Sequence, residues 1–156
     1  MNTSRLLLAI AAFLIGFSSM AQDVVYVDAS VFPVYGKISE ETNERYERLP
    51  ARLEGVSRKA VWTRGRHSSG LYIRFRSNST SIHVKWESLF NNHYNHMTDI
   101  CTKGLDLYAL VDGKWRFVAP GRPSADGVST YTLAKNMTPV NREFMLYLSM
   151  YDGVKS

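Results

Sequence analysis

The chain has 156 residues, of which 45% are hydrophobic and 21% are charged, with 19 Lys and Arg against 14 Asp and Glu. This length fits one domain and excludes a multidomain enzyme or a large α/β barrel. The composition is that of a globular protein and excludes wholesale disorder. The net charge of +5 comes from scattered residues and not from a Lys/Arg run, so we expect no nucleic-acid partner.

The first 21 residues have the pattern of a secretory signal peptide. Arg5 gives a positive start, residues 6–17 form an apolar run, and Ser19 and Ala21 place small side chains where a signal peptidase cuts. The run is shorter than the roughly 20 apolar residues that a spanning helix needs. We therefore predict a mature domain over 22–156 that is secreted or periplasmic, with no membrane contact after cleavage. Cys101 is the one cysteine, so no internal disulfide is expected.

Alternating apolar residues predict short antiparallel strands along the mature chain. In residues 71–76, Leu71, Ile73 and Phe75 share one face, and residues 82–87 repeat the pattern after a turn. We predict that these two segments form a hairpin with one solvent-exposed face. Further strands are expected over 105–111, 115–118, 128–133 and 144–150, with shorter candidates over 24–27 and 60–63.

The turns between these segments favour an all-β fold. Asp112-Gly113 is a two-residue hairpin signal between the strands on either side of it. No segment after the signal peptide has a sustained helical period, although residues 40–48 could form one helical turn before Leu49-Pro50 ends it. Many short strands about ten residues apart predict an antiparallel β-sandwich that is jelly-roll-like.

Two polar segments carry the candidate binding residues. Residues 91–99 are rich in Asn, His and Tyr, which is typical of a hydrogen-bonding loop that could hold a polyhydroxyl ligand. If this segment were helical, His93, His96 and Asp99 would share a face and could bind a metal, but the spacing is unconvincing and we predict no metal and no cofactor. In residues 62–70, serines lie beside Arg66 and His67 without a nucleophile motif, so we predict a polar loop and no catalytic residue.

Asp106 lies in the middle of a predicted strand, where its type is disfavoured. It should therefore have a partner. A salt bridge to an Arg of a neighbouring strand or loop and a contact with a ligand or another domain are both open.

Several segments in order resemble one known domain. The run Gly104-Leu105-Asp106-Leu107-Tyr108 is its signature, and the resemblance covers residues 34–156. The other segments are residues 46–50, 61–62, 69–75, 96–98, 145–148 and 151–153. Together they resemble the N-terminal β-sandwich (GxDLY-type) domain of SGNH (GDSL-type) esterases.

The resemblance implies a jelly-roll-like domain followed in cis by a catalytic SGNH domain. The family acts on ester bonds, and we expect the substrate to be an acylated carbohydrate. The Gly-Asp-Ser and Asp-x-x-His motifs of that second domain are not in this sequence. The resemblance therefore indicates a chain truncated or split before its catalytic partner. Residues 154–156 look like the start of a strand that returns to the sandwich, and we expect residues 144–150 to have an unpaired edge.

Three functions follow from these observations. The first is a non-catalytic accessory domain of an exported SGNH-type esterase, which shapes the cleft or binds glycan. The second is a free-standing carbohydrate-binding module with an exposed aromatic platform, for which Trp62, Trp86 and Trp115 are candidates. The third is a small hydrolase or metal enzyme in which His93, His96 and Asp99 converge on one point. The residues expected to contact a ligand or another domain are Arg66, His67, His93, Tyr94, Asn95, His96 and Asp106.

Overall fold

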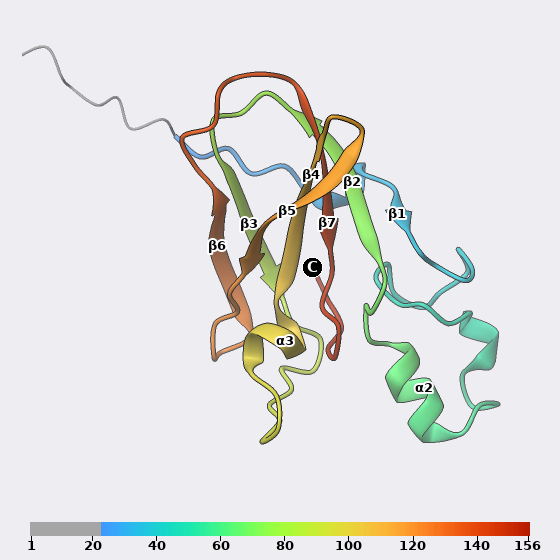
Figure 1. The fold of residues 1–156 in the computed structure, drawn as a ribbon. Helices are drawn as coiled ribbons and strands as arrows, with labels where there is room; N and C mark the ends of the chain where they lie inside the picture. Colours follow the sequence, from blue (N-terminus) through green and yellow to red (C-terminus); the bar gives the residue numbers. More distant parts are fainter. Residues whose placement is uncertain (1–22) are drawn as a thin grey trace, which may run out of the picture.

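The structure is a computed structural model, and it describes residues 23–156. The predicted signal peptide, residues 1–21, lies outside the described residues. The described chain forms two antiparallel sheets that face each other, with short helices at one end (Figure 1). Among the described residues, none of the helices combines the length and the apolar character needed to cross a membrane.

Seven strands and two α-helices make up the fold. The strands are β1 (Val34–Tyr35), β2 (Tyr72–Ser77), β3 (Ile82–Glu87), β4 (Leu105–Val111), β5 (Lys114–Gly121), β6 (Val128–Ala134) and β7 (Arg142–Tyr147). The helices are α2 (Lys59–Gly65) and α3 (Asp99–Lys103), and single 3₁₀ turns span Ala29–Val31 and Ala51–Leu53.

One sheet has five strands in the order β1-β2-β7-β4-β5, and the other pairs β3 with β6. Every strand pair is antiparallel. The predicted antiparallel sandwich is therefore confirmed. The jelly-roll connectivity stays a prediction, because that fold takes eight strands in two Greek keys and the described residues form seven.

The core lies between the two sheets and is built from alternate residues of each strand. In β4, Leu105, Leu107 and Ala109 are buried, whereas Asp106 and Tyr108 lie on the opposite face. Because side chains alternate across a strand, this face of the five-stranded sheet turns away from the core. The buried hydrophobic residues that pack together as this core are Tyr46, Leu71, Ile73, Ile82, Trp86, Leu105, Leu107, Ala109, Leu133, Phe144, Leu146, Leu148 and Val154.

The predicted hairpin between residues 71–76 and 82–87 is wrong. The strands exist, but β2 pairs with β1 and β7, and β3 pairs with β6 in the other sheet. The two strands lie in different sheets, so the connection over 78–81 is not a hairpin turn. The connection therefore crosses between the sheets, and the two apolar faces meet across the core.

The second predicted hairpin is confirmed. Asp112 and Gly113 have φ values of 51° and 72°, and they join Val111 to Lys114, which are paired across the turn. Two successive residues with positive φ match the right-handed twist of the flanking strands.

Two of the short predicted strands are also wrong. Residues 60–63 lie in α2. The prediction failed because a run of four apolar and polar residues does not distinguish a strand from one helical turn. Residues 24–27 form no strand, and the side chains from Val24 to Val27 are 45% to 82% exposed.

The expected unpaired edge at residues 144–150 is wrong as well, since β7 lies between β2 and β4 in the sheet. The expected return of residues 154–156 is found. Val154 forms a β-bridge with Ser88, and the Glu87 N–H donates to the Ser156 carbonyl at 2.8 Å. This segment therefore extends the sheet of β3 beside the end where α3 lies.

Candidate functional site

The helices α2 and α3 lie at one end of the sandwich (Figure 1). Side chains around them line an end groove. Its volume is about 460 Å³. Three parts of the chain line it: the polar segment around α2, the loop before α3 and the turn after β7. The lining residues are Arg48, Arg64, His67, Ser69, Tyr94, His96, Met97, Met150 and Tyr151.

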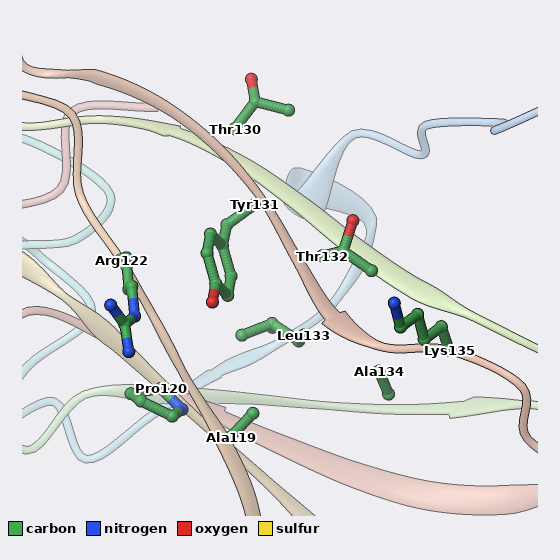
Figure 2. A pocket seen from close by; sticks show the side chains of 9 residues that line it. All are labelled: Ala119, Pro120, Arg122, Thr130, Tyr131, Thr132, Leu133, Ala134 and Lys135. Carbon is green, nitrogen blue, oxygen red and sulfur yellow. The ribbon is translucent and has the colours of Figure 1, made fainter.

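A second hollow of about 670 Å³ lies between β5 and β6, at the side of the sandwich (Figure 2). Tyr131 and Leu133 of β6 line it together with Ala119 and Pro120. This hollow is the larger of the two, and Arg122, Lys135 and two threonines also line it, but it contains none of the predicted site residues. We therefore take the end groove, which gathers ionisable and hydrogen-bonding groups, as the candidate site.

Asp152 holds two walls of the end groove together. Its carboxylate is fully buried. Oδ1 accepts hydrogen bonds from the Phe90 N–H at 2.9 Å and the Gly153 N–H at 2.7 Å, and Oδ2 accepts one from the Asn92 N–H at 2.7 Å. Backbone donors satisfy this buried charge, so the turn after β7 and the loop before α3 are fixed to each other.

Ser68 connects the segment after α2 to the same turn. Its hydroxyl is fully buried, donates to the Tyr46 carbonyl at 2.8 Å and accepts from the Val154 N–H at 2.9 Å. Its backbone N–H also donates to the Asp152 carbonyl at 3.0 Å. The floor of the groove is thus fixed by hydrogen bonds between segments far apart in sequence.

Arg48 caps the C-terminal end of α2. Its Nε donates to the His67 carbonyl at 2.9 Å and its Nη2 to the Arg64 carbonyl at 2.7 Å. The last carbonyls of a helix have no partner within the helix, and a guanidinium satisfies both the hydrogen bonds and the negative end of the helix dipole. The remaining N–H groups of Arg48 stay available to the groove.

Lys103 supports the loop before α3 from beneath. Its side chain is completely buried, and Nζ donates to Asn91 Oδ1 at 2.5 Å and to His93 Nε2 at 3.1 Å. His93 Nδ1 lies 3.1 Å from Asp99 Oδ1. Because Nε2 accepts from the ammonium, we assign the proton of the neutral imidazole to Nδ1, where it bonds to Asp99.

The end groove has a positive electrostatic character. Arg48 and Arg64 line it, and no acidic side chain does. The His67 ring is buried and packs against Phe90 at 5.6 Å between ring centroids. Burial, with a smaller effect from Arg64, lowers the pKa of His67 below 6.5, so this imidazole is neutral at pH 7.

The structure brings some of the predicted site residues together and separates others. His67, Tyr94 and His96 line the end groove, and Asn95 contacts His96 through Oδ1 and Nδ1 at 3.1 Å. Arg66 does not line it, because its Nε pairs with Glu47 Oε1 at 2.5 Å and its guanidinium lies over Phe90.

The metal-binding geometry that the third hypothesis requires is not found. His93 and Asp99 are in contact, but Nε2 of His93 is occupied by Lys103, and His96 packs against Tyr94 instead. Over residues 23–156, no group of three or more His, Cys, Asp and Glu side chains is placed to hold a metal ion. His93, His96 and Asp99 therefore do not converge as the third hypothesis requires.

Asp106 lies away from the end groove, on the outer face of the five-stranded sheet. It is directly opposite Tyr147 of β7 and Pro120 of β5. Of the two alternatives left open for Asp106, the salt bridge to an Arg is not found: within the described part of the chain, the Asp106 carboxylate forms no hydrogen bond or ion pair. Partial burial raises its pKa.

The tryptophans form no common platform. Trp86 is buried in the core and its Nε1 donates to the Lys103 carbonyl at 3.1 Å. Trp62 is half-buried on α2 and Trp115 is half-buried on β5.

Reasoning from sequence missed six lining residues, namely Arg48, Arg64, Ser69, Met97, Met150 and Tyr151. A signal existed for Arg48, Ser69, Met97 and Tyr151, because each lies in a segment that carries the resemblance to the esterase domain. Arg64 and Met150 have no such signal, since they reach the groove through the paths of α2 and of the turn after β7.

The fold and this site now place the chain in a class. The family model GxDLY, described as the N-terminus of the SGNH-hydrolase-type esterase, matches residues 24–156. The chain belongs to this family. It is thus an N-terminal accessory domain of the SGNH (GDSL) esterase type, which is normally joined to an SGNH catalytic domain.

A solved structure agrees with this assignment. The chain is similar to a Bacteroides ovatus ATCC 8483 protein described as a GDSL-like lipase, with 34% sequence identity and a TM-score of 0.81. The similarity covers 86% of this chain but only 39% of the other. The chain therefore spans well under half the length of that protein. No curated protein matches the chain.

Proposed function

We propose that this chain is the accessory domain of an exported SGNH-type esterase that acts on acylated carbohydrate, and that the end groove lies against the catalytic cleft. There it shapes the cleft and holds part of the glycan, and the domain itself carries out no chemistry. Export is supported by the signal-peptide pattern of residues 1–21.

One observation carries this proposal: the end groove is built next to the end of the family match. In this family the catalytic domain follows the matched region, which ends at residue 156. Tyr151 lines the groove, Asp152 fixes its walls, and Val154 is hydrogen-bonded to Ser68 beneath it. A domain that follows Ser156 would therefore start within a few residues of the groove.

The chemistry of the groove suits a binding role. Tyr94, Tyr151 and His96 offer flat rings, and Ser69 and the two arginines offer hydrogen-bond donors. The pair of Ser68 and His67 does not have the arrangement of an activated nucleophile: the Ser68 hydroxyl is occupied by Tyr46 and Val154, and the neutral His67 packs against a phenylalanine.

The non-catalytic role is tested by an esterase assay of the purified chain with a chromogenic acetate, for which we expect no hydrolysis above buffer. Hydrolysis that disappears in His96→Ala but persists in the control His83→Ala would overturn it. The partner is tested by the reading frame downstream of residue 156. An SGNH domain encoded there is the expected result, and its absence would favour a free-standing module.

A further inference from the structure

The outer face of the five-stranded sheet carries an aromatic strip, which we define as Tyr35, Tyr72, Tyr147, Tyr108 and Phe117. Each of the five strands contributes one ring. The centroids of successive rings are 5.3, 5.1, 5.7 and 5.5 Å apart. Strands in a sheet are about 4.8 Å apart, so the strip crosses roughly 19 Å of the sheet.

The strip follows from the strand register. Tyr35 is opposite Tyr72, Tyr72 is opposite Tyr147, and Tyr108 is opposite Phe117. Directly opposed residues share a face, so these rings pack side by side on the surface turned away from the core. At the edges of the strip, Tyr35 is 38% exposed and Phe117 is 55% exposed.

The tyrosine hydroxyl groups and one carboxylate of this face are free for a ligand. Across the described residues, the hydroxyl groups of the four strip tyrosines form no hydrogen bond to protein. Asp106 extends the row of Tyr35, Tyr72 and Tyr147, because it lies opposite Tyr147 in the strand register. Its carboxylate also forms no hydrogen bond or ion pair within the described residues. A half-buried carboxylate without a partner costs stability, which is typical of a position retained for binding.

We propose that the aromatic strip and Asp106 form a second binding surface, for a neutral, extended oligosaccharide that lies across the strands. The rings take the apolar faces of the sugars, and the tyrosine hydroxyls and the Asp106 carboxylate bind sugar hydroxyl groups. This surface is separate from the end groove and does not depend on it.

Charge selects a neutral ligand over an anionic one. Arg74 and Arg76 lie on the same face, but Glu143 pairs with both of them. Together with Asp106, these two arginines and Glu143 give no net formal charge, which suits a neutral sugar better than an anionic one. The raised pKa of Asp106, caused by partial burial, agrees with a site that prefers uncharged partners.

Charge also disfavours a protein partner on this face. The buried centres of protein interfaces are depleted of charged residues, and an unpaired carboxylate enclosed there costs several kcal/mol. A sugar donates hydroxyl groups to such a carboxylate without enclosing it. The catalytic domain is therefore assigned to the end groove, and a separate stretch of glycan to the strip.

The test is a titration of the purified full chain with three neutral β-1,4-linked hexasaccharides, of glucose, xylose and mannose, followed by calorimetry and by NMR of the tyrosine ring signals. At least one hexasaccharide should bind and shift the strip signals. Tyr35→Ala, at the exposed edge, and Asp106→Asn should each raise Kd about tenfold or more. Circular dichroism reports whether each variant is folded.

Tyr26→Ala is the matched control, because Tyr26 is 51% exposed and lies outside the strip. Tyr26→Ala should leave Kd unchanged. Absence of binding for all three hexasaccharides, or equal binding by the strip variants, would overturn the proposal. Strip signals that shift only when an SGNH catalytic domain is added would assign this face to that domain and would also overturn it.

Discussion

The Asn92 N–H donates a 2.7 Å hydrogen bond to Oδ2 of Asp152, and this bond joins residues sixty positions apart in the chain. The other oxygen of the same fully buried carboxylate is bonded to Phe90 and Gly153. One side chain thereby fixes the loop before α3 to the turn after β7. The shape of the end groove depends on it.

We expect Asp152→Asn to destabilise the domain by about 3 kcal/mol. The amide has nearly the same shape, but it points an NH₂ group at a backbone N–H and removes a charge that three donors stabilise. Urea unfolding measures the change. Asp126→Asn alters an exposed carboxylate bonded only to the Val128 N–H and should cost under 1 kcal/mol, so equal losses in the two variants would contradict the role of Asp152.

We expect that only glycine fits at position 104, the first residue of the signature, because there is no room for a side chain. A Cβ on Gly104 would lie 2.3 Å from the Ile100 carbonyl oxygen and 2.9 Å from that of Gly121, and neither backbone atom can move freely. Gly104→Ala should therefore cost about 1–3 kcal/mol or more.

Gly121→Ala is the matched control for Gly104→Ala. Gly121 lies beside Gly104, but its nearest neighbours are side-chain atoms at 3.4 Å, which is ordinary contact distance. Thermal unfolding of the two variants should differ by several degrees. A Gly104→Ala variant as stable as Gly121→Ala would show that the backbone around α3 is less rigid than described.

His67 should make the domain less stable as the pH falls from 7.5 to 5.5. Burial holds its pKa below the value of 6.5 that it has when unfolded. The unfolded chain therefore binds a proton first, and the free energy of unfolding decreases below about pH 6.5. We expect His67→Leu to reduce this dependence.

The comparison of urea unfolding at the two pH values measures that effect. His96→Gln removes an exposed imidazole of the same groove and should retain the full acid dependence. An unchanged dependence in His67→Leu would locate the acid sensitivity elsewhere.

Asp106→Asn should stabilise the domain at pH 7. Partial burial raises the pKa of Asp106, so the charged carboxylate destabilises the folded state above that pKa. Solvent screening at this half-exposed site keeps the expected gain small, about 0.5 kcal/mol. The gain should vanish at acidic pH, where both states bind the proton; destabilisation at pH 7 would instead reveal a partner for the carboxylate.

Much of the fold was predictable from sequence because each long strand buries one face. Leu71 and Ile73, like Leu105 and Leu107, alternate with outward residues, and this alternation is visible in any such strand. It shows which face is buried but not which strand lies alongside. The arrangement of β2 and β3 in different sheets was therefore missed, while the Asp112-Gly113 turn, which fixes its own geometry, was found.

The site was only partly predictable for a related reason. His67, Tyr94 and His96 stand out by residue type, and they do meet at the end groove. Their meeting depends on Asp152 and Ser68, whose partners are backbone groups that carry no sequence signal. The aromatic strip was missed because its tyrosines come from separate strands, and only the strand order and register align them.

The central claim, that the end groove lies against the esterase cleft, is tested most directly in the enzyme that carries this domain upstream of its SGNH domain. The measurement is kcat/KM for an acetylated xylo-oligosaccharide and for a small chromogenic acetate, with Tyr151→Ala and the control Tyr26→Ala. We predict that Tyr151→Ala lowers kcat/KM for the oligosaccharide about tenfold and leaves the small ester unchanged, because only the larger substrate reaches the groove. Equal kcat/KM values for the oligosaccharide in both variants and the parent enzyme would contradict the claim.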